Sequence, residues 1–377
     1  MNNPLLRRVM LAVAAPLLAG LFAVVVSAIV LEVSGSPALD TFRTIGENGL
    51  KLETMIDTLN RATPLFLAAV AAAIGFRMNL FNIGVEGQYI LAAFLAAVVG
   101  SKVDLPGVLH VAVIIATAML VGALWSGLAG LLLVSRGVNE VISTIMLNFI
   151  ATGGIVAGLL PRFIDDPTAA NQGTPTLAES GWLPDLNGVV EIFTREIGKG
   201  RELTGVLVIA LMVGVIYHVI INRSLLGFDI RASGMNPLAA RVGGVPPKRM
   251  IMVAMIGGGL VAGLVGMPEI LSDTHAYDQG FIQGLGFAGI GVALLGRNTS
   301  AGMAAAALLF GFLDSSSAVL QVRASASSEI VVIMQATFLL AAVVAYEVVN
   351  RVKQRDEVAR AVRATTEMAS NEAAVSA

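Results

Sequence analysis

The chain has 377 residues, of which 56% are hydrophobic and only 13% are charged, and its mean hydropathy is +0.82. Soluble domains carry roughly 25% charged residues, so this chain has too few charges to cover a surface that faces water. Its net charge of −2 gives no sign of a nucleic-acid partner. Cysteine is absent, which excludes disulfides and thiol ligands, and the three histidines are scattered. Composition therefore predicts an integral membrane protein without a structural metal site.

The chain begins with Arg7 and Arg8, followed by an apolar run over residues 9–31. A secretory signal has a similar charge pattern, but its apolar region is only about 7–15 residues long and ends at a small-residue cleavage site. The run at 9–31 is long enough to cross a bilayer, and no such cleavage pattern follows it. We expect it to be a retained first membrane span.

Further apolar runs are separated by polar breaks along the whole chain. Backbone polar groups in lipid must be paired within the segment, so each run is expected to be a helix. The ten runs are 9–31, 62–76, 83–100, 107–134, 140–160, 203–221, 249–267, 280–296, 300–320 and 329–350. The pattern predicts an all-α polytopic membrane protein with about ten transmembrane helices. The runs at 62–76 and 280–296 are short for a bilayer, and must tilt, break or lie inside the bundle.

Basic residues indicate the orientation, because cytoplasmic loops are enriched in Lys and Arg. With the N-terminus inside and ten alternating spans, most basic residues fall on the cytoplasmic side, and both termini are cytoplasmic. We expect a membrane domain over residues 1–350 and a cytoplasmic tail over 351–377. Two long loops, 32–61 and 161–202, then lie outside. The second is rich in Pro, Gly, Asn and Asp, and is either an irregular connector or a docking surface for a soluble partner.

The largest inside loop spans residues 222–249 and contains a short helix signal. Asn236 can cap a helix whose first residue is Pro237, and Gly243-Gly244 can end it. Such a helix is either a simple turn between two spans or a knob that fits a groove in a partner.

The loop also carries a family signature. Its segment R-A-S-G-M-N-P-L-A-A-R-V-G-G-V resembles the coupling-helix signature of permeases from ATP-binding cassette (ABC) importers for ribose, branched-chain amino acids and nucleosides. The segment G-L-G-F-A-G-I-G-V-A-L-L-G-R-N-T-S-A-G, from 284 to 302, resembles the block that follows it in that family. F-R-M-N-L-F-N-I-G-V-E-G-Q (76–88) and V-N-E-V-I-S-T-I-M-L-N-F-I-A (138–151) resemble the nucleoside and simple-sugar branch.

The resemblance implies a type II importer permease of the bacterial inner membrane that moves nucleosides or a related simple sugar by alternating access. It implies a second permease subunit in a heterodimer, ATPase subunits that bind ATP and Mg²⁺, and an extracytoplasmic substrate-binding protein, with no cofactor in this chain. The loops at 161–202 and 268–280 would meet that binding protein. The residues expected to couple to the ATPase are Gly234, Asn236, Pro237, Ala240, Arg241, Gly243 and Gly244.

Polar residues inside apolar runs are candidates for the translocation pathway, because intramembrane polar groups are often functional. These candidates are Asn79, Asn82, Glu86, Gln88, Asn148 and Asp314. For Glu86 the alternative is a carboxylate that caps a helix N-terminus. For Asn148 and Asp314 the alternative is polar packing between helices.

Two further observations restrict the function. Gly284-x-Gly286-x-x-Gly289 fits a dinucleotide fingerprint, but it lies in an apolar run with no preceding strand, so close helix packing is expected there and at Gly259-x-x-x-Gly263. No G-x-x-x-x-G-K-[ST] loop occurs anywhere, so energy must come from another subunit or an ion gradient. The rival hypothesis is a stand-alone secondary transporter or channel, which would need more paired intramembrane charges. A membrane enzyme would need a His/Asp/Glu cluster that the sequence does not show.

Overall fold

The structure is a computed structural model that describes residues 20–22, 24–35, 37–49, 51–165, 168, 172–188, 191, 201–323, 331–341, 344 and 351. Arg7 and Arg8, the first part of the run at 9–31, part of the loop at 161–202 and almost all of the predicted tail lie outside the described residues. The chain forms two compact units, one of residues 44–320 and one of residues 1–43 with 321–377. In its described part the smaller unit contains helical residues 24–33 and the helix Val331–Ala341.

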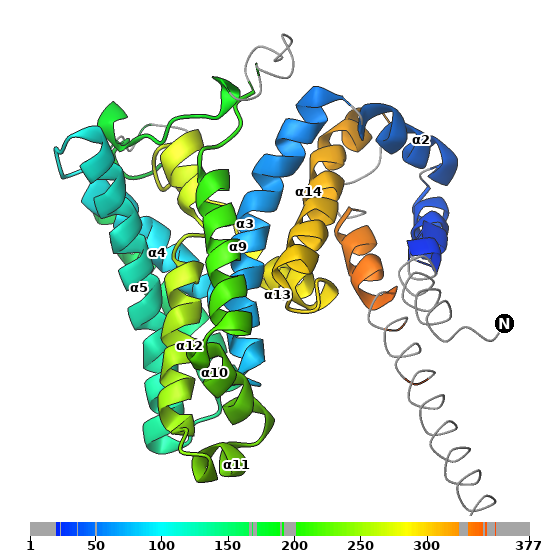
Figure 1. The fold of residues 1–377 in the computed structure, drawn as a ribbon. Coiled ribbons are helices and arrows are strands. Elements are labelled where there is room, and N and C mark those ends of the chain that lie inside the picture. The colour runs from blue at the N-terminus through cyan, green and yellow to red at the C-terminus, as the bar shows by residue number, and fades with distance from the viewer. Residues whose placement is uncertain are drawn as a thin grey trace, which may run out of the picture. The chain divides into compact units, whose positions relative to one another are not determined.

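The larger unit is helical throughout most of its described part (Figure 1). Its α-helices are α3 (Leu52–Arg77), α4 (Val85–Gly100), α5 (Gly107–Arg136), α6 (Glu140–Phe149), α7 (Ala157–Leu159), α9 (Val206–Arg223), α10 (Leu225–Met235), α11 (Pro237–Val242), α12 (Pro247–Ala262), α13 (Leu285–Leu295) and α14 (Ser300–Arg323). Helix α2 (Ala38–Gly49) leads into it, and the π-helical η1 (Ile150–Val156) joins α6 to α7. Shorter helical turns are η2 (Leu160–Arg162), η3 (Glu179–Gly181) and η4 (Glu269–Asp273).

Helix α3 forms the centre of this unit. Residues 67–73 have no exposed surface, and α3 packs against α9, α12 and α13. The helix is longer than the apolar run at 62–76 that predicted it. It begins ten residues earlier, over polar residues that hydropathy alone does not mark as part of a span.

Glycines allow the helix backbones to approach closely, as expected where lipid provides no hydrophobic drive for association. A Cβ atom on Gly259 would lie 2.3 Å from Gly122 O, and one on Gly263 would lie 2.1 Å from Ala118 O, which locks α12 against α5. A Cβ on Gly289 would lie 2.4 Å from Ala68 Cβ, so α13 lies directly on α3. The expectation of close helix packing at both glycine motifs is confirmed.

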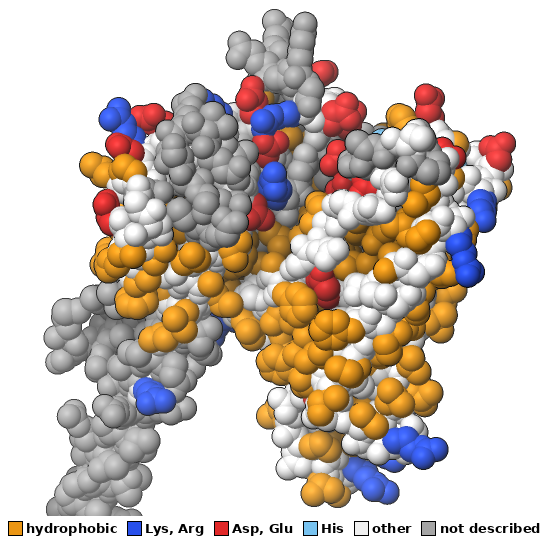
Figure 2. Space-filling view, turned by 180° about the vertical axis from the view of Figure 1, so that it is seen from behind, with side chains coloured by type: hydrophobic (Ala, Val, Ile, Leu, Met, Phe, Trp, Pro, Cys, Tyr) orange, Lys and Arg blue, Asp and Glu red, His pale blue; other side chains and the backbone are white. Residues whose placement is uncertain are grey.

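Large apolar side chains are exposed on the outer faces of α5, α6 and α9. Apolar side chains also cover much of the middle of the face that Figure 2 shows. On α5 they recur every three or four residues, at Leu120, Leu124, Leu128 and Leu131, which is one stripe of a helix. Within the described residues four helical segments are long and apolar enough to cross a membrane: Leu52–Arg77, Gly107–Arg136, Glu140–Arg162 and Val206–Arg223. An apolar stripe that faces outward on such helices is suited to lipid. The total of ten spans stays a prediction.

The two ends of the larger unit differ in charge. Helix α11 lies at one end, with the last turns of α3, α5 and α9 (Figure 1). Basic residues gather there: Arg77, Arg136, Arg223, Arg231, Arg241, Lys248, Arg249 and Arg297. At the other end, where α3 begins and α12 is followed by η4, acidic residues are frequent, as the upper part of Figure 2 shows. Basic residues are thus concentrated at the end that carries α11, and the side of the membrane that this end faces stays a prediction.

Candidate functional site

Helices α10 and α11 form a bent pair at the basic end of the larger unit. Asn236 joins them: its backbone N–H donates to Ala232 O, which closes α10, and its side-chain Oδ1 accepts from the N–H groups of Leu238 and Ala239, both at 3.0 Å. Pro237 occupies the first position of α11, where a missing N–H has no cost. The predicted cap is confirmed.

The end of α11 is also built as predicted. Gly244 has φ of +86°, a left-handed conformation that glycine adopts readily. Its N–H donates to Arg241 O, and the N–H of Val245 donates to Ala240 O at 2.9 Å, which is the bond pattern of a Schellman motif. A six-residue helix is therefore fixed at both ends by local hydrogen bonds.

This pair presents apolar side chains to the outside. Met235, Leu238 and Val242 are each at least 78% exposed, and Arg241 is exposed between them, whereas Ala240 is buried against the rest of the unit. Large apolar side chains exposed on a rigid knob indicate an interaction surface. The structure brings together the expected coupling residues in this α10–α11 pair or directly beside it: Gly234, Asn236, Pro237, Ala240, Arg241, Gly243 and Gly244.

Asn79, by contrast, is exposed and ends a helix. It follows the C-cap residue Met78 and has φ of +58°, and its N–H donates to Phe76 O while that of Leu80 donates to Gly75 O. Asparagine is one of the few residues that adopts this left-handed position without much strain. Residues 78–84, between α3 and α4, form a non-helical segment.

Asn82, Gln88 and Asn148 come together at the start of α4. Asn82 Oδ1 accepts from the Gly84 N–H and from Gln88 Nε2, both at 3.0 Å. Asn148, on α6, donates from Nδ2 to Ile83 O and accepts at Oδ1 from the Gly87 N–H, both at 2.9 Å. Asn82 and Asn148 therefore pair with two backbone groups of the non-helical segment, the Gly84 N–H and Ile83 O, and Gln88 holds the Asn82 side chain in place. Non-helical backbone inside a membrane protein needs such partners.

Glu86 joins α4 to α13. Glu86 is 6% exposed, and its carboxylate accepts from the N–H of Gly284 at 2.6 Å, the N–H of Gly286 at 2.8 Å and the hydroxyl of Tyr89 at 3.1 Å. A carboxylate is favoured at the N-terminus of a helix by the free N–H groups and the helix dipole. Glu86 thus caps a helix, but the helix is α13, about 200 positions further along the chain, and not its own.

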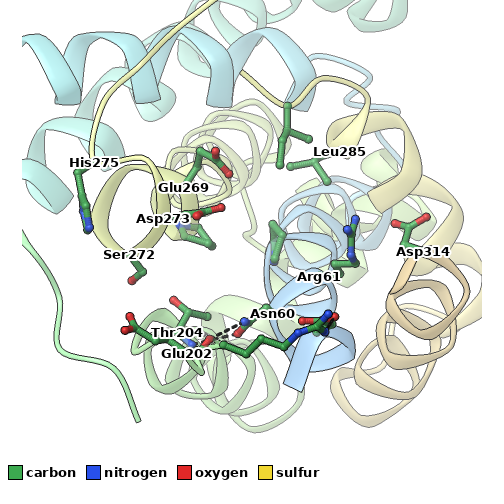
Figure 3. Close-up of a pocket in the computed structure, with 15 residues that line it drawn as sticks. Asn60, Arg61, Glu202, Thr204, Glu269, Ser272, Asp273, His275, Leu285 and Asp314 are labelled. Atoms are coloured by element: carbon green, nitrogen blue, oxygen red, sulfur yellow. Dashed lines mark hydrogen bonds and ion pairs between the residues drawn. The ribbon is translucent and has the colours of Figure 1, made fainter. Parts of the chain in front are cut away.

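A cavity of about 580 Å³ lies at the acidic end of the larger unit (Figure 3). Its lining residues are Asp57, Asn60, Arg61, Pro64, Arg201, Glu202, Thr204, Pro268, Glu269, Ser272, Asp273, His275, Ile282, Leu285 and Asp314. They come from the start of α3, the segment before α9, the loop around η4, the start of α13 and the middle of α14. Asn60 ties two of these elements together, since its Nδ2 donates to Glu202 O at 2.7 Å and its Oδ1 accepts from the Thr204 N–H at 3.0 Å.

Carboxylates dominate the lining, with five acidic residues against two arginines, and one of those arginines, Arg201, is paired with Asp57. Burial, together with the neighbouring carboxylates of Asp273 and Asp278, raises the pKa of the Glu269 carboxyl to about 7. Ser272 Oγ and His275 Nδ1 are buried and have no hydrogen-bond partner within the described residues. The cavity therefore offers several acceptors and donors to a polar solute.

The two loops expected to meet an outside partner lie side by side next to this cavity. Thr174 N–H donates to Tyr277 O at 2.8 Å, Leu177 N–H donates to His275 O at 2.8 Å, and a bridge joins Gly173 to Asp278. The ring of Trp182 stacks on that of His275, with centroids 4.0 Å apart. The described parts of the loops 161–202 and 268–280 thus form one surface.

The pathway candidates fall into three groups, of which the first is Asn79 alone, exposed after the end of α3. Asp314 lines the cavity. Asn82, Glu86, Gln88 and Asn148 are buried at the start of α4, where they connect helices. Sequence reasoning missed Asn60, Arg61 and Thr204 as cavity residues. The polar residues directly before the run at 62–76 could have indicated Asn60 and Arg61. Where a helix continues beyond an apolar run with polar side chains, that part of it borders water or a cavity.

A helical bundle with lipid-suited outer faces, a cavity at one end and an exposed short helix at the other is the arrangement expected of a membrane transport permease. The sequence matches, over residues 54–345, the family described as branched-chain amino acid transport system / permease component. The chain belongs to this family: it is a multi-pass membrane permease subunit of an ABC importer and not the ATPase subunit. The stand-alone transporter or channel that the sequence left open is therefore set aside.

Named relatives cover most of the chain. The guanosine ABC transporter permease protein NupP of Bacillus subtilis is 33% identical over 331 residues, covering 86% of this chain and 91% of the relative. The glucose ABC transporter permease protein TsgB13 of Haloferax volcanii is 29% identical over 331 residues, 88% of this chain and 87% of the relative. The guanosine ABC transporter permease protein NupQ of Bacillus subtilis is 26% identical over 268 residues, 68% and 79% of the two chains.

Proposed function

We propose that this permease moves nucleosides into the cell by alternating access, with simple sugars as the nearest alternative substrates. The observation that carries the mechanism is the α10–α11 pair, a rigid exposed knob at the basic end of the unit. The substrate class is supported by the names of the relatives, which include guanosine and glucose permeases.

Helix α11 would dock into a groove of a partner ATPase. Leu238 and Val242 supply the apolar contact, and Arg241 supplies a charge at its edge. The cap of Asn236 and the Schellman motif at Gly244 keep the knob helical before docking, so the partner does not have to order it on binding. The basic residues around α11 support a cytoplasmic position for this end and for both termini.

The cavity at the opposite end would then be the extracytoplasmic mouth of the pathway. Its volume falls within the roughly 300–1,000 Å³ of small-molecule sites. Carboxylates and amides accept hydrogen bonds from the hydroxyl groups of a ribose or a hexose, and Arg61, Asn60 and Ser272 can donate. None of the lining residues is Phe, Tyr or Trp, so the lining offers no large ring on which a base could stack, and discrimination between nucleosides would occur mainly in the binding protein.

Two further partners are proposed, a substrate-binding protein and a second permease subunit. The joined surface of the loops 161–202 and 268–280 would receive the substrate-binding protein. A second permease subunit is proposed because Bacillus subtilis has two guanosine permease proteins, NupP and NupQ, that are both similar to this chain. These observations support a heterodimer of permeases.

Purification of the tagged chain from its native host in mild detergent tests this proposal. An ATPase subunit and a second permease should co-purify, and the binding protein of the same complex should bind labelled guanosine more tightly than glucose. Failure to recover an ATPase would contradict the function, and preference for glucose would move the substrate to the sugar class.

A further inference from the structure

Helix α10 rests directly on the backbone at the end of α3. A Cβ atom on Gly234 would lie 2.7 Å from the carbonyl carbon of Met78 and 2.9 Å from Arg77 O, so only glycine fits there without a shift. Asn236 joins α10 to α11 without an intervening linker, because it closes one helix and caps the other. A displacement of α11 is therefore carried to Arg77 and Met78 through backbone contact.

The side chain of Arg77 reaches the turn between α13 and α14. Its Nη2 donates to Asn298 O at 2.6 Å, and its Nε donates to the Tyr217 hydroxyl at 3.4 Å. Tyr217, which is 3% exposed on α9, donates its own hydroxyl to the same Asn298 O at 2.7 Å. Two donors from two different helices thus hold one carbonyl oxygen.

The turn that they hold has an unusual backbone. Arg297 and Asn298 have φ of +57° and +53°, two successive left-handed residues that are not glycine. Such conformations cost free energy and persist only where the surroundings fix them. The turn is also tight, since a Cβ on Gly296 would lie 2.3 Å from Met303 N. The position of the turn is thus fixed by its contacts with Arg77 and Tyr217 and by its own close packing.

Both helices that leave this turn lead to the cavity. Leu285, at the start of α13, and Asp314, in the middle of α14, line it. We propose that Arg77 is the positioning residue that connects the α11 knob to the cavity helices, its backbone receiving α10 and its side chain holding the α13–α14 turn. The inference rests on the proposed function and adds the residue through which movement of α11 reaches the helices that line the cavity.

The test reconstitutes the complete complex, including the binding protein, in proteoliposomes. Uptake is measured with labelled guanosine or glucose, whichever the wild-type complex takes up. The measured quantity is the number of substrate molecules transported per ATP hydrolysed. Arg77→Met should assemble and hydrolyse ATP but lower this ratio at least tenfold. Arg77→Lys, which keeps one charged donor, should lower it about threefold, and Tyr217→Phe two- to fivefold. Arg136→Met removes an exposed arginine at the same end and is the matched control, with no expected change.

An Arg77→Met complex with a wild-type ratio would overturn the proposal. So would a parallel loss of transport and ATP hydrolysis that leaves the ratio unchanged, because that result defines a purely structural role. If Arg77→Met does not assemble, Tyr217→Phe decides, and an unchanged ratio for it overturns the proposal. A wild-type chain that recruits no ATPase contradicts the proposed function instead, so the two failures are distinguishable.

Discussion

The cap of α11 gives a prediction whose size can be worked from the structure. Asn236 Oδ1 accepts from two backbone N–H groups of α11, both at 3.0 Å, and the side chain is otherwise exposed. Replacing such a cap by Ala costs about 0.5–2 kcal/mol of helix stability. A helix of six residues has little stability of its own, so Asn236→Ala should leave α11 partly unfolded while the membrane helices remain intact.

If α11 must be helical to dock, this loss appears in the affinity for the ATPase. Each 1.4 kcal/mol corresponds to a factor of ten, so the dissociation constant should rise roughly 2- to 30-fold. The assay is a titration of the detergent-solubilised permease with purified ATPase subunit. Asn236→Asp keeps a strong cap and should bind like the wild type. Asn222→Ala, which removes an exposed asparagine in the last turn of α9, is the matched control. Equal affinities for Asn236→Ala and Asn236→Asp would refute the reasoning.

Three further predictions concern the rest of the molecule. Because the pKa of the Glu269 carboxyl is raised in the folded state, its contribution to stability is fully present below the ordinary pKa of 4.5 and is lost as the pH rises through about 7. Glu269→Gln should therefore raise the melting temperature at pH 8 and leave it unchanged near pH 4.5. Equal gains in melting temperature at both pH values would contradict the assignment. Glu86→Ala should destabilise the purified protein by roughly 1–3 kcal/mol for each buried donor left without an acceptor, with Glu86→Gln milder, as thermal unfolding in detergent would show; an unchanged melting temperature would mean that the α4–α13 junction does not depend on this carboxylate. The chain has no cysteine, so single cysteines at two exposed positions can report the membrane orientation: Val108→Cys (Val108 is 87% exposed) and Val242→Cys (Val242 is 91% exposed). An impermeant maleimide should label the first in intact cells and the second only after permeabilisation. The reverse labelling pattern would mean that the topology is opposite to the predicted one.

The sequence predicted features that depend on neighbouring residues. The α11 helix was predicted with its cap and its stop because Asn-Pro and Gly-Gly act over three or four residues, and both are confirmed. The apolar runs located most helices of the larger unit, since the membrane imposes a simple length and composition.

Features that depend on distant contacts could not be predicted. The start of α3 is polar, and only the folded chain shows that Asn60 meets Glu202 and Thr204, more than 140 positions away. Glu86 was recognised as a possible cap, but its partner helix α13 could not be identified from spacing. The hydrogen bonds of Arg77 and Tyr217 to Asn298 O join α3 and α9 to the α13–α14 turn, and no local sequence pattern indicates them.

The proposed function requires that a partner ATPase drives this permease subunit through α11. The most direct measurement is ATP-dependent uptake by proteoliposomes that contain the complete complex, compared for the wild type and Arg241→Glu. Arg241 is exposed on α11, so the reversed charge should leave membrane insertion and the melting temperature unchanged while uptake falls at least tenfold, and the wild type should show no uptake without the ATPase subunit. Full uptake by Arg241→Glu, or uptake by the wild-type permease without any ATPase, would contradict the account.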